Sequence, residues 1–181
     1  MELTFVTSNR HKLSEIREIL RPFGITLRWS RRDLPEPQAS SLEAVVRAKL
    51  AAAGAGRRRV LVEDSGLFIR VLGGFPGVYS RPVYETIGLA GVLAVVRGKD
   101  RRAVFRTVAG VQRGRRVLLA VGETEGSIAR APRGLHGFGY DPIFIPKGHR
   151  RTFAEMPAPM KNRLSHRGRA LRSIARRLSH R

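Results

Sequence analysis

The spacing of apolar residues predicts alternating strands and helices in the first half of the chain. Strands are expected at residues 3–6, 25–29, 60–62 and 67–69, and helices follow the first two of them. The first helix carries apolar residues at helical spacing from Leu13 and ends at the break formed by Pro22 and Gly24. Between the third and fourth runs, Gly66 is expected to let the backbone turn.

The second half of the chain continues the mixture of helices and strands. A helix is predicted at 84–96, a hairpin of strands at 103–111 and 116–123, a third strand at 125–131, and a last helix from about Arg163. The helix at 84–96 is apolar on more than one face, which indicates either deep packing or a subunit contact. The strands alternate poorly, so we expect them to be covered on both faces.

The composition indicates a single soluble domain. A chain of 181 residues can form one domain, residues 1–181, or two lobes that share a core. It contains no Cys, starts without a signal pattern and has no apolar run long enough to span a membrane. These features predict a protein of the reducing cytoplasm without a membrane partner.

The charge balance raises a separate possibility. Thirty-five basic against 14 acidic residues give a formal net charge of +21, which is typical of nucleic-acid-binding proteins. The Arg residues are scattered along the chain, however, and a hot habitat or a biased genome gives the same composition. We therefore expect no dedicated nucleic-acid site, and keep a basic nucleic-acid-binding protein as the alternative.

Two adjacent carboxylates interrupt an apolar stretch and need an explanation. Neighbouring side chains in a strand point to opposite faces, so only one of Glu63 and Asp64 needs to face a given ligand. Asp64 is the candidate for the working carboxylate. The Gly- and Pro-containing segment from Gly73 to Gly77 is expected to let the backbone approach a ligand closely.

Two predicted helix starts offer cationic side chains. Residues 7–9, Thr-Ser-Asn, form a strand-to-helix turn with unpaired N–H groups, and Lys12 lies one turn into the helix. The alternative is an ordinary Ser or Asn N-cap with a solvated Lys. At the second helix, Ser40 and Glu43 have the spacing of a capping box, and Lys49 falls on the face that should be buried.

The C-terminal third contains a glycine-flanked aromatic residue and a basic helix start. Phe138 lies between Gly137 and Gly139, where its ring can meet a flat partner, while core packing is the alternative. Four polar residues mark the predicted start of the last helix, Lys161, Ser165, His166 and Arg167. Composition alone favours a solvated basic helix end there.

Several blocks of sequence, in one order along nearly the whole chain, resemble the inosine/xanthosine triphosphate pyrophosphatase family. They are TSNRHK, EDSGLFIRVLGGFPGVYS, GFGYDPIF, TFAEM and SHRGRAL, and the segment YETIGLAGVL is most similar to the archaeal branch. The resemblance implies an α/β fold in which a long central mixed sheet has flanking helices in two lobes, with the active-site cleft between them.

The resemblance also implies an activity. The family hydrolyses ITP, dITP and XTP to the monophosphate and pyrophosphate, which removes non-standard purines from the nucleotide pool. It uses Mg²⁺ and usually forms a homodimer. A pyrophosphatase for other modified nucleotides is a second alternative, although it would lack the SHR and GFGYD blocks.

The same resemblance assigns roles to individual residues. Asp64 would take the proton from the attacking water and, with Glu43, hold the metal, with Glu63 nearby. Lys12 would take part in catalysis as well as in binding phosphate. His166 and Arg167 would donate to the 6-oxo group of the base, which adenine lacks. The remaining substrate-binding candidates are Thr7, Ser8, Asn9, Lys49, Ser65, Phe138, Gly139, Tyr140, Asp141 and Lys161.

Overall fold

The computed structural model describes residues 1–54, 56 and 58–179, and the elements below are those of that part of the chain. Seven strands form one sheet, in the order β2-β1-β3-β5-β6-β7 with β4 on β3. The strands are β1 (Glu2–Val6), β2 (Thr26–Ser30), β3 (Val60–Ile69), β4 (Pro76–Gly77), β5 (Arg102–Arg113), β6 (Arg116–Ile128) and β7 (Phe144–Pro146). The α-helices are α1 (Arg10–Leu20), α2 (Leu42–Ala53), α3 (Ser80–Val95), α4 (Ala158–Leu164) and α5 (His166–Ser179).

The sheet is mixed, because β1 pairs in parallel with β2 and β3, whereas β4 and β7 pair antiparallel with β3 and β6. The predicted α/β fold with a mixed sheet and flanking helices is therefore confirmed. None of the helices in the described ranges is long and apolar enough to cross a bilayer.

The chain divides into two compact units. Unit 1 comprises Met1–Asp64, Thr107–Gly122 and His166–Arg181, and unit 2 comprises Ser65–Arg106 and Glu123–Ser165. Strands β3, β5 and β6 each contribute residues to both units. The expected single domain in two lobes with an intervening cleft stays a prediction.

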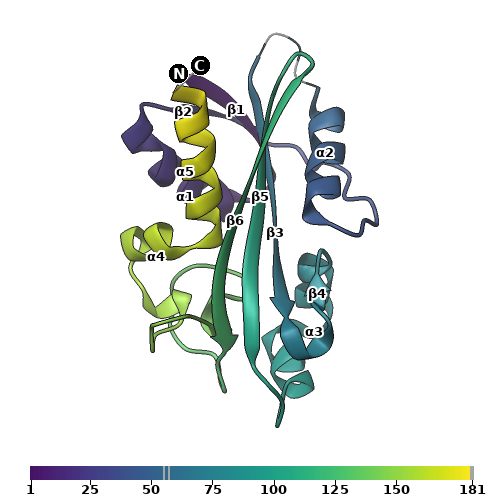
Figure 1. Ribbon diagram of the computed structural model, residues 1–181, viewed down its shortest axis with the longest axis vertical. Coiled ribbons are helices and arrows are strands. Elements are labelled where there is room, and N and C mark those ends of the chain that lie inside the picture. Colours follow the sequence, from purple (N-terminus) through teal and green to yellow (C-terminus); the bar gives the residue numbers. More distant parts are fainter. Residues whose placement is uncertain (55, 57, 180–181) are drawn as a thin grey trace. The chain divides into compact units, whose positions relative to one another are not determined.

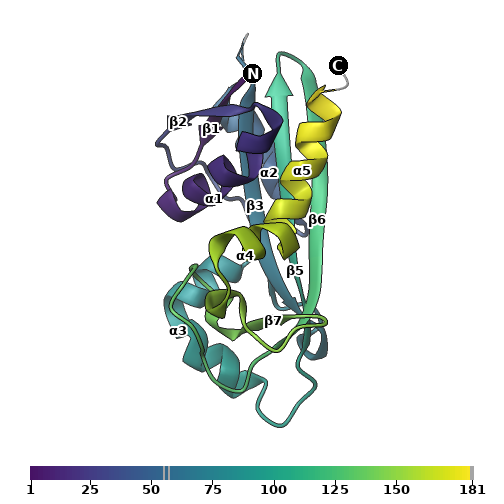
Figure 2. The same cartoon turned by 90° about the vertical axis from the view of Figure 1, so that its left-hand side faces the viewer.

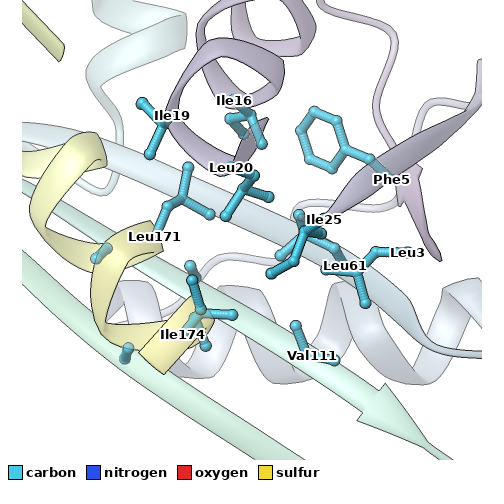
Figure 3. Packing of buried hydrophobic residues seen from close by; sticks show 14 of the residues in the cluster. Leu3, Phe5, Ile16, Ile19, Leu20, Ile25, Leu61, Val111, Leu171 and Ile174 are labelled. Atoms are coloured by element: carbon cyan, nitrogen blue, oxygen red, sulfur yellow. The ribbon is translucent and has the colours of Figure 1, made fainter. Parts of the chain in front are cut away.

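In unit 1, helices α1 and α5 lie on one face of the strands and α2 lies on the other (Figure 1). The face of α1 toward the sheet is apolar at helical spacing, which is why this helix packs there. Figure 3 shows Ile16 and Leu20 of α1 meeting Leu61 of β3 and Leu171 of α5. Burying each such side chain stabilises the unit by roughly 1.5–3 kcal/mol.

Unit 2 has a core built on aromatic rings. Phe105 of β5 packs edge-to-face on Phe144 of β7, with ring centroids 4.8 Å apart, and on Tyr140, 6.4 Å away. Phe153 completes the cluster. Figure 2 shows α3, α4 and β7, three of the elements that belong to this unit.

The strands differ from the prediction at two places. Residues 60–69 form one continuous strand, so the expected turn at Gly66 is wrong. Gly66 is required there for another reason, because a Cβ at this position would lie 2.3 Å from the carbonyl oxygen of Gly77 on β4. The predicted strand at 125–131 is the continuation of β6. Coverage of both faces is confirmed for residues 107–111 of β5, whereas β6 alternates between buried and exposed positions.

The helices also differ from the prediction. Helix α3 begins four residues early, at Ser80, and is interrupted at Gly88, whose φ of 60° and ψ of −166° are not helical. Only Ser80 and Val92 of this helix are buried, so deep packing is wrong and a subunit contact stays a prediction. The last helix begins at His166 and not at about Arg163, because Ser165 is extended, with ψ of 153°, and separates it from α4, which was not predicted. Lys161 therefore lies inside α4 and not at a helix start.

The close approach of β4 to β3 predicts a large difference between two strand glycines. In Gly66→Ala the new Cβ meets backbone that cannot move aside, so we expect a loss of about 1–3 kcal/mol of unfolding free energy. In Gly110→Ala the neighbours are the side-chain ends of Val46, Leu50 and Leu119, which can shift. That matched variant should lose clearly less unfolding free energy than Gly66→Ala, because side-chain atoms move aside at lower cost than backbone does. Equal losses in urea unfolding would contradict the role given to Gly66.

Candidate active site

The two adjacent carboxylates of β3 pair with lysines from helices on opposite faces of the strand. Oε1 of Glu63 lies 2.7 Å from Nζ of Lys12 on α1, and Oδ1 of Asp64 lies 2.7 Å from Nζ of Lys49 on α2. Helices α1 and α2 cover opposite faces (Figure 1). The expectation that Glu63 and Asp64 point to opposite sides is therefore confirmed.

Lys49 joins two carboxylates. It is buried, as predicted, and its Nζ lies 2.7 Å from Oε1 of Glu36 as well as 2.7 Å from Asp64. Burial opposes the charged ammonium, but the two carboxylates together raise the pKa of Lys49 above its usual value. Burial also raises the pKa of Asp64, against the opposing effects of Lys12 and Lys49. Asp64 is thus a better proton acceptor than an exposed aspartate.

The metal ligands were predicted to be Asp64 and Glu43, and the structure brings a different glutamate to Asp64. Ser41, not Ser40, caps α2, because its Oγ accepts from the N–H of Ala44 at 3.2 Å. The predicted Ser40–Glu43 capping box is therefore wrong, because the residue three positions after the true N-cap is Ala44, which has no carboxylate. Glu36 shares the ammonium of Lys49 with Asp64. In the described part of the chain, no three His, Cys, Asp or Glu side chains form a metal-binding group by themselves.

Sequence reasoning missed Glu36 because it lies in a loop without periodicity. The loop runs from residue 31 to residue 41 and connects β2 to α2. The signal that could have identified Glu36 is its position between Pro35 and Pro37, since two fixed φ angles hold the backbone of the intervening carboxylate.

The turn after β1 is an Asn-capped helix start. Oδ1 of Asn9 accepts from the N–H of Lys12 at 3.1 Å, and the N–H of Asn9 donates to Oγ1 of Thr7 at 3.1 Å. Oγ of Ser8 donates to Asp33 at 2.5 Å. The N-cap alternative is thus confirmed, but the solvated Lys12 that went with it is wrong, because Lys12 pairs with buried Glu63.

The residues proposed to read the base, His166 and Arg167, are both buried at the start of α5. Nη1 of Arg167 donates to Oε2 of Glu15 at 2.7 Å. Nε of Arg167 lies 3.6 Å from Oε2 of Glu63, which is an ion-pair distance and longer than a hydrogen bond. Sequence reasoning also missed Glu15. Its signal was a carboxylate one turn after Lys12 on the same helix.

Unit 2 contains a second group of candidates around Asp141. Its Oδ2 accepts from the N–H of Phe138 at 2.7 Å and from Nζ of Lys161 at 2.5 Å. That ammonium lies 5.1 Å from the centroid of the Phe138 ring. The loop depends on Gly137, because its φ is 74° and a Cβ there would lie within 2.9 Å of Cγ of Asp141. Phe138 is half-buried and outside the core cluster of unit 2, so the core-packing alternative is wrong.

Three other candidates belong to unit 2. The ring of Tyr140 belongs to the core of unit 2, and its hydroxyl donates to the carbonyl of Ser80 at 2.7 Å. Burial raises the pKa of the Tyr140 phenol, so the hydroxyl stays protonated. Ser65 and Gly139 are half-buried. Tyr140 therefore supports the loop from within the core.

The candidates fall into two sets by unit. Unit 1 contains Thr7, Ser8, Asn9, Lys12, Glu43, Lys49, Asp64, His166 and Arg167, and unit 2 contains Ser65, Phe138, Gly139, Tyr140, Asp141 and Lys161. Within each unit the structure brings charged residues from distant parts of the chain into contact. Glu63 lies between Lys12 and Arg167, Glu15 pairs with Arg167, and Glu36 pairs with Lys49.

Proteins of known name share both the sequence and the fold. A dITP/XTP pyrophosphatase from Pyrococcus horikoshii is 47% identical over 176 residues, covering 96% of this chain and 95% of the relative. One from Pyrobaculum aerophilum is 44% identical and covers 100% of this chain and 98% of the relative. A HAM1 protein from Coxiella burnetii superposes with a TM-score of 0.82 at 33% identity, with all of both chains covered.

The predicted resemblance to this group, including its archaeal branch, is confirmed by these near-complete matches. The family model of the Ham1 family matches residues 3–177, which include every candidate residue named above. Agreement over that length cannot arise from one shared motif, and the chain belongs to the Ham1 family.

Proposed function

We propose that this protein hydrolyses dITP, ITP and XTP between the α and β phosphates, releasing the monophosphate and pyrophosphate. The observation that carries the proposal is the pairing of buried Lys49 with buried Asp64 and with Glu36, in a chain whose full-length relatives are named dITP/XTP pyrophosphatases. Such a reaction would remove deaminated purine triphosphates from the nucleotide pool.

Hydrolysis of a triphosphate needs charge neutralisation and a positioned water more than covalent chemistry. Mg²⁺, when bound, would neutralise phosphate charge through oxygen ligands. We assign its protein ligands to Asp64 and Glu36, because these carboxylates already hold one cation between them, the ammonium of Lys49. Glu43 is the competing assignment. Asp64 also accepts the proton of the attacking water, a task that its raised pKa favours.

Different residues bind the phosphates and the base in this proposal. Lys12 and Lys49, with the turn from Thr7 to Asn9, supply the cationic and N–H groups for the triphosphate. Lys161 touches Asp141 and the ring of Phe138, so we assign it to the base-binding loop and not to the phosphates.

The ring of Phe138 stacks on the purine in this proposal. His166 and Arg167 donate to the 6-oxo group. Adenine places an amino group there and leaves these donors unpaired, which disfavours ATP.

The protein also has surfaces that bear on its partners. Four apolar residues of α3 and its N-cap are 39–44% exposed, namely Tyr79, Tyr84, Ile87 and Val95. We assign these exposed residues to contact with a second copy in a homodimer. For location we propose the reducing cytoplasm, which suits a chain without Cys. Nucleic acid should bind weakly and without sequence preference at physiological salt.

A pyrophosphate-release assay over a panel of nucleoside triphosphates tests the activity. We expect ITP, dITP and XTP to be hydrolysed far faster than ATP. Asp64→Asn should lower kcat about 10²-fold or more while the protein stays folded, because an amide cannot accept the proton. A wild-type protein that cleaves ATP and ITP equally, or an active Asp64→Asn variant, would remove this assignment.

The two candidate metal glutamates give a matched pair. Glu36→Gln should raise the Mg²⁺ concentration required for half-maximal rate by at least about tenfold, because it removes a ligand oxygen's charge. Glu43→Gln, in the first turn of α2, should leave that requirement unchanged. The reverse result in a Mg²⁺ titration would return the metal to Glu43.

The pKa of Asp64 can be measured directly in the metal-free protein. Burial keeps this pKa above its usual value, while the positive charge of Lys49 opposes the rise. Lys49→Met removes that charge, so the carboxyl resonance of Asp64 should titrate at higher pH than in the wild type. Arg47→Met, an exposed cation on the same helix, is the control and should not move it. A lower midpoint in Lys49→Met would refute the ion pair.

A further inference from the structure

Four charged side chains in unit 1 form a chain of alternating sign. Lys12 contacts Glu63 at 2.7 Å, Glu63 contacts Arg167 at 3.6 Å through its other oxygen, and Arg167 contacts Glu15 at 2.7 Å. The two ends, Lys12 and Glu15, lie three residues apart on α1. A single rigid helix therefore fixes both ends of the chain, while β3 and α5 supply its middle.

The inner members of this chain are shielded from water. The side chain of Glu63 is 0% exposed and that of Arg167 is 3% exposed, whereas Lys12 retains 18% exposure. Buried charges are screened little, so a displacement of one of them changes the balance of forces on the next. Lys12 is the most exposed member and is the one proposed to meet phosphate.

A phosphate that attracts Lys12 would weaken its hold on Glu63. The other oxygen of that carboxylate faces Nε of Arg167, and the 3.6 Å separation between them can close to hydrogen-bond length. Two carboxylates would then fix the planar guanidinium, Glu15 at Nη1 and Glu63 at Nε. The remaining N–H donors of Arg167 would be held in one direction.

We propose that Glu63 and Glu15 are positioning residues that couple phosphate binding at Lys12 to base discrimination at Arg167. The proposal rests on the function proposed above. Coupling of this kind is reciprocal, so a base that engages Arg167 also favours the phosphate-bound arrangement of Lys12. A purine triphosphate with the wrong base would therefore bind less favourably both at Arg167 and at Lys12.

The first test uses inorganic triphosphate, which contains no base, and follows the Nε–H resonance of Arg167 by NMR. In the wild type, triphosphate should shift this resonance. In Lys12→Met, Glu63 is already released, so the resonance should start near the shifted position and respond little. Arg17→Met is the matched control, because Arg17 is an exposed cation on the same helix as Lys12 and lies outside the chain of four charges. It should keep the wild-type response.

The second test measures base discrimination as the ratio of kcat/KM for ITP to that for ATP. Glu15→Gln should lower this ratio about fivefold or more, because Arg167 loses its outer anchor. Glu18→Gln changes an exposed glutamate one turn later on the same helix and should keep the ratio within about twofold. Melting temperatures of both variants separate positioning from loss of fold.

The outcomes separate this coupling from the proposed activity. Absence of pyrophosphate release from ITP by the wild type would refute the activity, while the Arg167 resonance reports on the coupling without any turnover. A resonance that ignores triphosphate in the wild type, or that responds equally in Lys12→Met, would overturn the coupling. An unchanged ITP-to-ATP ratio in Glu15→Gln would overturn the role of Glu15.

Discussion

Pairing of buried charges is the constraint on which the candidate site depends. Glu63 and Asp64 lie in the middle of a strand whose other residues are largely buried, where an unpaired carboxylate is too costly to keep ionised. Each is tolerated because a lysine from a covering helix reaches it. Removing one partner of such a pair commonly costs about 3–5 kcal/mol, so the helices and the strand hold one another in register. The site exists in this arrangement only because both faces of β3 are covered.

The same pairing explains how the protein can stay folded without a ligand and still bind a polyanion. Lys12 and Lys49 have protein carboxylates as partners in the structure. A triphosphate with its metal carries both negative and positive charge. The phosphates can therefore replace the carboxylates as partners of the lysines, while the metal replaces the lysines as partner of the carboxylates. Specific binding then depends on exchange between ion pairs, and not on a net positive surface.

Much of this could be predicted from the sequence, and the reasons for the failures are physical. Apolar spacing located α1 and β1, because each buries one regular face. It placed a turn at Gly66, because a glycine in a strand gives the same signal whether the backbone turns or another strand approaches it. It missed α4 and began the last helix at about Arg163, because Leu164 and Leu171 are seven residues apart, which is a helical spacing.

The candidate site shows the same limit. The position of Lys49 on a buried face, and the opposite directions of Glu63 and Asp64, follow from helix and strand periodicity. Glu36 has no periodic neighbours, and its contact with Lys49 spans 13 residues. Glu15 contacts Arg167 across 152 residues, a pairing that only the folded chain reveals.

The opposite directions of Glu63 and Asp64 have a consequence for how this gene can change. Because side chains alternate along a strand, deleting or inserting one residue in β3 would send each carboxylate to the other's helix. Point substitutions elsewhere in β3 alter one contact at a time and can be compensated singly. An insertion or deletion of one residue could not be compensated singly, because it changes both ion pairs at once. Descendants of this chain should therefore inherit the Glu-Asp pair at constant spacing from the start of the strand, even where the surrounding residues diverge.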